Sequence, residues 1–150
     1  YAHEAGDPEY PKFLDRNGGF AEAMSQGDLS TATRQFLSFW SDGPPDELPA
    51  SALQMIESQI DLVPAQEPMI FPTGAPEQLR LEDLARLSCP VLLLRGARCE
   101  PITIAIHRAM MAHLPDAQEH VFDGAGHMAP VSDPVQTAAV IAPFLARAGY

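Results

Sequence analysis

The apolar positions in the second half of the chain follow a pattern of alternating strands and helices. Four consecutive apolar residues at 91–94, without polar alternation, predict a strand that is covered on both faces, as in a parallel sheet. A second strand is expected at 120–122. The stretch 102–114 predicts the crossover helix that two parallel neighbours require. With a short helix at 81–87 and a closing helix from 135 onward, these residues form a βαβα section.

The apolar positions in the first half predict helices instead. Asp28 is expected to be the N-cap of a helix that ends near Trp40. The apolar stripe of this helix consists of Ala32, Phe36, Phe39 and Trp40. A further helix follows Pro49, because apolar residues recur there at three- and four-residue spacing.

Glycines and prolines predict where the helices are broken. Gly18-Gly19 is expected to interrupt an earlier helical segment, which ends at Gly27. Prolines at 64, 68, 72 and 76 predict a loose stretch. We therefore expect a helical section at 1–80 and the βαβα section at 81–150.

Two strands are too few for a doubly covered sheet. Because the chain offers no convincing further strand, the pairing strands are expected in a segment before Tyr1. The first residue is Tyr rather than Met, so we expect processing, trimming of the chain or a missing upstream segment.

The charge balance narrows the choice of partners. The 150 residues carry a net charge of −11, and a hydrophobic content of 46% is ordinary for a globular domain with its own core. Residues 1–75 hold twelve acidic and three basic residues, against eight and six in the rest. Since an acidic surface repels phosphate backbones and anionic lipids, neither nucleic acid nor a membrane is an expected partner.

Cysteine use and apolar run lengths bear on location and cofactors. Cys89 and Cys99 flank the first predicted strand, whose length keeps them too far apart for a disulfide. Free thiols are typical of a reducing cytoplasm, which is the predicted location. No apolar run spans a bilayer and no signal peptide is visible. Neither a paired metal-ligand motif nor a glycine-rich phosphate loop occurs, so no metal or cofactor is expected.

Two segments of the βαβα section carry a family resemblance. Residues 89–96 read CPVLLLRG, residues 124–130 read GAGHMAP, and Asp133-Pro134 opens the closing helix. This order resembles the C-terminal end of the α/β-hydrolase fold, where the two segments are the penultimate core strand and the histidine loop. Residues before about 80 resemble the helical lid that this family inserts after its sixth strand. The resemblance implies an α/β fold with two parallel strands and flanking helices, preceded by this lid.

The resemblance also implies that the active site is incomplete within these residues. No Gly-x-Ser-x-Gly occurs in the chain. The nucleophile and the oxyanion hole are therefore expected in the N-terminal half of the fold, on the same precursor or on a second chain.

His127 is the residue that the resemblance marks as the general base. In such a triad a neutral imidazole accepts the proton of the nucleophile, so it must be fixed within hydrogen-bond reach. The tetrapeptide Gly-Ala-Gly-His alone would favour a histidine on a surface loop. The preceding strand, the crossover helix and the following Asp-Pro helix favour the catalytic role.

The acid of the triad has several candidates. The family often places an aspartate three residues after the glycine that ends the penultimate strand, but Cys99 occupies this position. Glu100 is the next residue and is a candidate to orient His127, with a solvated loop charge as the alternative. An acid after the sixth strand, upstream of the lid, is the third possibility. Asp123 is expected to face solvent.

The leading functional hypothesis is a hydrolase that acts on an ester, or a similarly activated carbonyl, of a small apolar substrate. Trp40, Phe36 and Met128 are the candidates for substrate contact, and packing inside the helical section is the alternative for the two aromatic residues. The fold hosts many reactions, so it does not by itself identify the chemistry. The alternative is a non-catalytic protein that binds a ligand or partner on a degraded hydrolase scaffold. Cys99 at the usual acid position favours this alternative, and the intact histidine loop opposes it.

Overall fold

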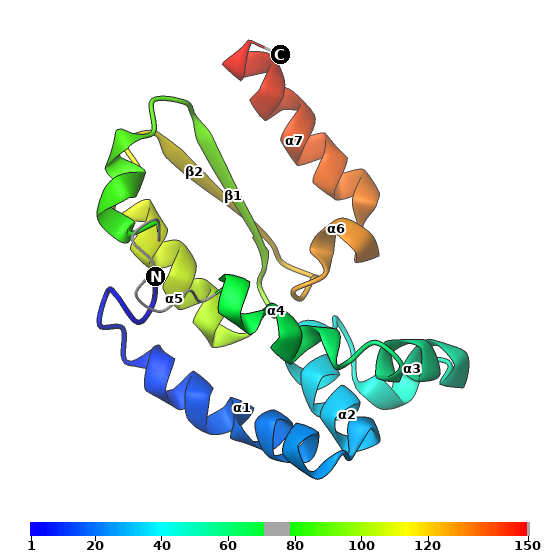
Figure 1. Ribbon diagram of the computed structural model, residues 1–150. Coiled ribbons are helices and arrows are strands. Elements are labelled where there is room, and N and C mark those ends of the chain that lie inside the picture. Colours follow the sequence, from blue (N-terminus) through cyan, green and yellow to red (C-terminus); the bar gives the residue numbers. More distant parts are fainter. Residues whose placement is uncertain (71–78, 150) are drawn as a thin grey trace.

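The computed structural model describes residues 1–70 and 79–149, which form helices around a small sheet (Figure 1). The α-helices are α1 (Glu9–Gln26), α2 (Leu29–Trp40), α3 (Ala50–Glu57), α4 (Leu62–Ile70), α5 (Pro101–Met111), α6 (Ala129–Ser132) and α7 (Pro134–Ala148). Two short 3₁₀ helices are η1 (Pro45–Glu47) and η2 (Leu81–Arg86), and the strands are β1 (Val91–Gly96) and β2 (Ala117–Phe122).

The two strands are parallel, as the sequence predicts. Their register runs from Val91 opposite Ala117 to Gly96 opposite Phe122, and α5 forms the crossover between them. The second strand is longer than expected, because its first three residues are polar or small and carry no apolar signal. The expected fold class, two parallel strands with flanking helices after a helical section, is therefore confirmed.

Helices cover both faces of the sheet. Val91, Leu93 and Ala117 lie on one face, where they pack against α5 and η2. Leu94 and Phe122 lie on the other face, with Val140 of α7 packed against the same cluster. Figure 1 shows α5 and α7 on opposite sides of the strands. This double coverage explains the apolar run without polar alternation at the first strand.

The turn between α1 and α2 follows the expected capping pattern. Gly27 takes the left-handed conformation (φ 71°) that ends α1, and the Asp28 carboxylate accepts a hydrogen bond from the Thr31 backbone N–H at 3.0 Å. The Thr31 hydroxyl also donates to the Asp28 carboxylate, at 2.7 Å. The two hydrogen bonds lower the pKa of Asp28.

The predicted interruption at Gly18-Gly19 is wrong, because α1 is continuous across both glycines. A Cβ at Gly19 would lie only 2.8 Å from the Nε2 atom of Gln35 on α2. The absence of a side chain at Gly19 therefore leaves room for the end of the Gln35 side chain. Glycine at this position lies inside the helix rather than at its end.

The predicted loose stretch is wrong in its first part. Pro64 is the third residue of α4, where a missing backbone N–H removes no intrahelical hydrogen bond. The helix continues through Pro68, and the prolines at 72 and 76 lie outside the described residues. The closing helix α7 likewise continues through Pro143 to Ala148.

The helical section packs against the crossover helix. Ala2, Ile102 and Ala105 are buried together, with Phe13 and Trp40 packed against them. The Arg108 guanidinium of α5 also donates to Asp7 at 2.8 Å. These contacts bring the C-terminal end of α2 to the end of the sheet.

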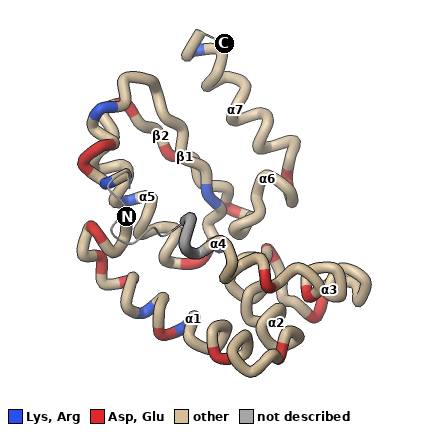
Figure 2. Tube along the Cα trace, viewed as in Figure 1, with Lys and Arg blue, Asp and Glu red and all other residues tan. Residues whose placement is uncertain are grey.

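The distribution of charge and the length of the apolar helices follow what the sequence predicts. Acidic positions outnumber basic ones along α1 to α3 (Figure 2). Within residues 1–70 and 79–149, no helix combines the length and the apolar character that crossing a membrane requires. Cys89 and Cys99 are both free, and the cytoplasmic location stays a prediction.

Candidate active site

The histidine loop, residues 123–128, connects β2 to α6 and carries His127. The backbone N–H of Ala97 donates to Phe122 at 2.9 Å, and that of Arg98 donates to the Ala125 carbonyl at 3.0 Å. The Arg98 guanidinium donates to the Gly124 carbonyl. The loop is therefore fastened to the segment that follows β1, and the exposed His127 lies at the carboxyl end of the sheet. Open α/β sheets bind ligands at this end.

Gly96 at the end of β1 allows this close approach. A Cβ at this position would lie 2.5 Å from the carbonyl carbon of Ala125 and would overlap the carbonyl oxygens of Ala125 and Gly126. Ordinary van der Waals contact begins at 3.4 Å. Any side chain here would therefore push the histidine loop away from the sheet.

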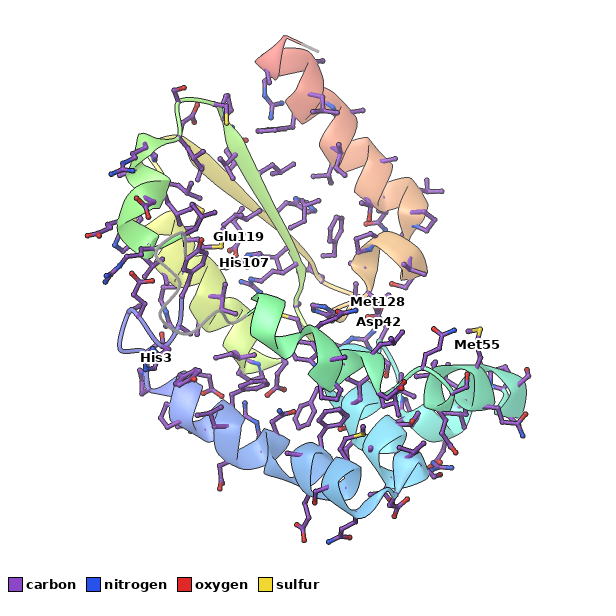
Figure 3. All side chains as sticks on the ribbon, in the orientation of Figure 1. His3, Asp42, Met55, His107, Glu119 and Met128 are labelled. Atoms are coloured by element: carbon purple, nitrogen blue, oxygen red, sulfur yellow. The ribbon has the colours of Figure 1, made fainter. Side chains whose placement is uncertain are left out.

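The end of α2 holds the histidine loop from the other side. The ring of Trp40 lies edge-on to the ring of His127, with 4.8 Å between their centroids. The Oδ1 atom of Asp42 accepts a hydrogen bond from the backbone N–H of Met128 at 2.7 Å. Figure 3 shows Asp42 and Met128 next to each other at this junction. The sequence analysis missed Asp42, whose only sequence signal is its position two residues after Trp40.

The three candidate substrate contacts are in different places. Trp40 and Met128 lie beside His127, and Met128 is 41% exposed. Phe36 lies one turn earlier on α2, against the core of the helical section around Phe20. It also lines a hollow of about 230 Å³ together with residues of α3 and α4 such as Ile56. Substrate contact by these residues stays a prediction.

Glu100 is engaged in an ion pair with Arg16 of α1. Its carboxylate accepts a hydrogen bond from the Nε atom of Arg16 at 3.0 Å, and Arg16 also pairs with Glu9 at 2.6 Å. The hydrogen bonds to Glu100 and Glu9 raise the pKa of Arg16. Only 12% of the Glu100 side chain is exposed, so it is not a solvated loop charge. Its role as the acid of a triad stays a prediction, whereas Asp123 is exposed as expected.

Cys99 lies beside Arg95, which forms a polar cluster with Glu119 and His107. The sequence analysis did not find this cluster. Burial raises the pKa of the Cys99 thiol, although the neighbouring Arg95 works in the opposite direction. A thiol in this state is a weak nucleophile.

Glu119 joins β1 and α5 in the same cluster. It accepts a hydrogen bond from Arg95 at 2.9 Å and lies 2.9 Å from the Nδ1 atom of His107 (Figure 3). Burial works against the charged carboxylate, but the hydrogen bonds with Arg95 and His107 outweigh it and lower the pKa of Glu119. The cluster links the sheet to the crossover helix.

Comparison with known proteins agrees with the resemblance seen in the sequence. A model of the alpha/beta hydrolase family matches residues 4–140. The crystal structure of a membrane phospholipase A, described as a bacterial virulence factor, is 24% identical and has a TM-score of 0.58. The alignment covers 85% of this chain and 43% of that one. Proline iminopeptidase from Mycobacterium smegmatis is 20% identical with a TM-score of 0.53, over 97% of this chain and 52% of that one.

The chain thus spans about half the length of these two structures. Among curated proteins, none matches significantly. At these identities the structural likeness concerns the fold, while the family match covers most of the 150 residues. The chain belongs to the alpha/beta hydrolase family.

Proposed function

We propose that this chain supplies the histidine side of a hydrolase active site, with His127 as the general base. The observation that carries the proposal is the fixation of the histidine loop at the carboxyl end of a parallel sheet. Gly96 lets the loop lie against β1, and Trp40 contacts the imidazole from α2. General base catalysis needs such a held imidazole, because the proton transfer requires hydrogen-bond distance.

The nucleophile and the oxyanion donors belong, in this proposal, to the N-terminal half of the same fold. Two facts support it: the chain spans 43% and 52% of the two solved structures, and it contains no Gly-x-Ser-x-Gly. Among the described residues β1 pairs with β2 alone, so its other edge is available to further strands. A serine would attack the substrate carbonyl. In a dehalogenase-like variant an aspartate would instead attack a halogen-bearing carbon, forming an ester bond as the halide leaves.

The acid is expected upstream rather than at Glu100. The Glu100 carboxylate is held by Arg16 from α1, so it would have to leave this ion pair to orient His127. The usual position is occupied by Cys99, which is not an acid. Both observations favour an acid after the sixth strand of the complete fold.

The substrate is proposed to be a small apolar ester or a similarly activated carbonyl compound. Trp40 and Met128 offer apolar surface directly beside His127, on the side where the helical section packs. In this proposal the helical section is a lid over the site. The hollow beside Phe36 supplies further apolar surface for a substrate chain.

A fluorophosphonate probe tests the proposal against the non-catalytic alternative. We expect the whole protein to be labelled at one serine and to hydrolyse p-nitrophenyl esters, with a preference that changes with acyl chain length. Heat-denatured protein is the control. A native protein that stays unlabelled and hydrolyses no ester would support the binding-protein alternative, which Cys99 at the usual acid position favours.

A further inference from the structure

We propose that Asp42 is a positioning residue that holds the histidine loop in place from the end of α2. This inference rests on the proposed role of His127. The carboxylate lies just beyond Trp40, the last residue of α2, and its Oδ1 atom accepts the backbone N–H of Met128 at 2.7 Å. The bonded amide belongs to the residue that follows the proposed base.

The loop is shaped to receive this carboxylate. A Cβ at Gly126 would lie 2.7 Å from the Oδ1 atom and 3.2 Å from the Cα atom of Asp42. A glycine immediately before His127 is therefore what lets the Asp42 backbone approach the loop. Trp40 contacts the His127 ring from the same helix end, so two contacts act on one short segment.

The two carboxylate oxygens of Asp42 differ in their hydrogen bonding. Its Oδ2 atom is buried and has no hydrogen-bond partner within the described residues. The Met128 amide is thus the one described hydrogen-bond partner of this carboxylate. The bond between the Oδ1 atom and the Met128 amide therefore ties the carboxylate to the histidine loop, so Asp42 and the loop hold each other in register.

The consequence is a coupling between the helical section and the base. Proton transfer from the nucleophile needs the imidazole at hydrogen-bond distance, and a displacement of about 1 Å lowers the rate by about 10²-fold. Because Trp40 ends α2 and Asp42 follows it two residues later, a movement of the C-terminal end of this helix would also move His127. Asp42 does not touch the reacting atoms and acts through the loop.

Kinetics of three variants in the whole protein test the inference. We expect Asp42→Ala to lower kcat for ester hydrolysis by about 10- to 100-fold while KM changes less than about threefold. Asp42→Asn keeps an oxygen acceptor for the Met128 N–H and should restore kcat to within about threefold. Asp46→Ala is the matched control, because Asp46 is an exposed acid whose described partner is Arg34. It should leave kcat unchanged.

Hydrogen exchange of the Met128 amide, followed by NMR, is the readout that needs no activity. Asp42→Ala should speed this exchange about tenfold or more, whereas Asp42→Asn and Asp46→Ala should leave it slow. An amide that stays equally protected in Asp42→Ala would overturn the inference, whatever the activity. An Asp42→Ala protein with full kcat would also overturn it, provided that His127→Ala has lost activity. If His127→Ala is fully active, the proposed function fails, and fast exchange in Asp42→Ala would still support the loop contact alone.

Discussion

Replacing Gly96 by alanine perturbs the contact between β1 and the histidine loop by a single methyl group. The new Cβ would lie 2.5 Å from the carbonyl carbon of Ala125 and closer still to two carbonyl oxygens, against 3.4 Å for ordinary contact. The obstacle is backbone, so no side-chain rotation relieves it. The loop must therefore retreat by roughly 1 Å, the scale of displacement that lowers rates by about 10²-fold.

Two effects of opposite sign act on the stability of Gly96→Ala. Overpacking typically destabilises by about 1–3 kcal/mol. The retreat also weakens the backbone hydrogen bonds from Ala97 to Phe122 and from Arg98 to Ala125, at about 0.5–1.5 kcal/mol each. Alanine restricts the unfolded chain and offsets only about 0.4–1 kcal/mol. The net result is a loss of about 1–5 kcal/mol in the free energy of unfolding, toward the lower end where the two hydrogen bonds are only lengthened.

Denaturant unfolding and ester hydrolysis of the same samples check this prediction. Gly18→Ala is the control with the same chemical change, because a Cβ at Gly18, inside α1, meets nothing within 4 Å. We expect it to stabilise by about 0.5–1 kcal/mol without a change in activity. A Gly96→Ala protein with wild-type stability and wild-type kcat would refute the reasoning.

Three other changes have expected outcomes. Glu119→Gln should lower the free energy of unfolding by about 1–3 kcal/mol at pH 7. Because the pKa of Glu119 is lowered from 4.5, the stability difference between wild type and variant should shrink as the pH falls below this value. Denaturation at pH 7 and pH 3 would contradict this if the two stability differences were equal. Cys99 should react with iodoacetamide far more slowly than the exposed Cys89, because burial raises its thiol pKa, and equal labelling in peptide mass spectrometry would contradict this. Residues 1–150 expressed alone should aggregate through the unpaired edge of β1, and a monomer that melts cooperatively would contradict this expectation.

The elements with local signals were predictable from the sequence. The apolar run of β1, the crossover helix and the Asp28 cap depend on residues that lie close together in the chain. His127 was singled out as the candidate base because the strand before it and the Asp-Pro helix after it are local signals as well, and its role stays a prediction. Gly18-Gly19 misled the prediction, since the close approach of Gln35 to Gly19 appears only when α1 and α2 pack.

The contacts that shape the candidate site had no such signal. Asp42 and Met128 are 86 positions apart, and Arg16 and Glu100 are 84 apart. Periodicity and capping patterns extend over a few turns of helix, so they carry no information on pairs at this separation. The same limit explains why Glu100 was assigned either to the triad or to solvent, and not to an ion pair with α1.

The rate of ester hydrolysis by His127→Ala, measured as kcat/KM in the whole protein, tests the central claim most directly. His127 is exposed, so its truncation should leave the fold intact, and His113→Ala on the segment after α5 is the matched control. We predict that His127→Ala loses about 10²- to 10⁴-fold in kcat/KM while His113→Ala keeps its rate. A folded His127→Ala protein that hydrolyses esters as fast as the control would contradict the assignment of His127 as the general base.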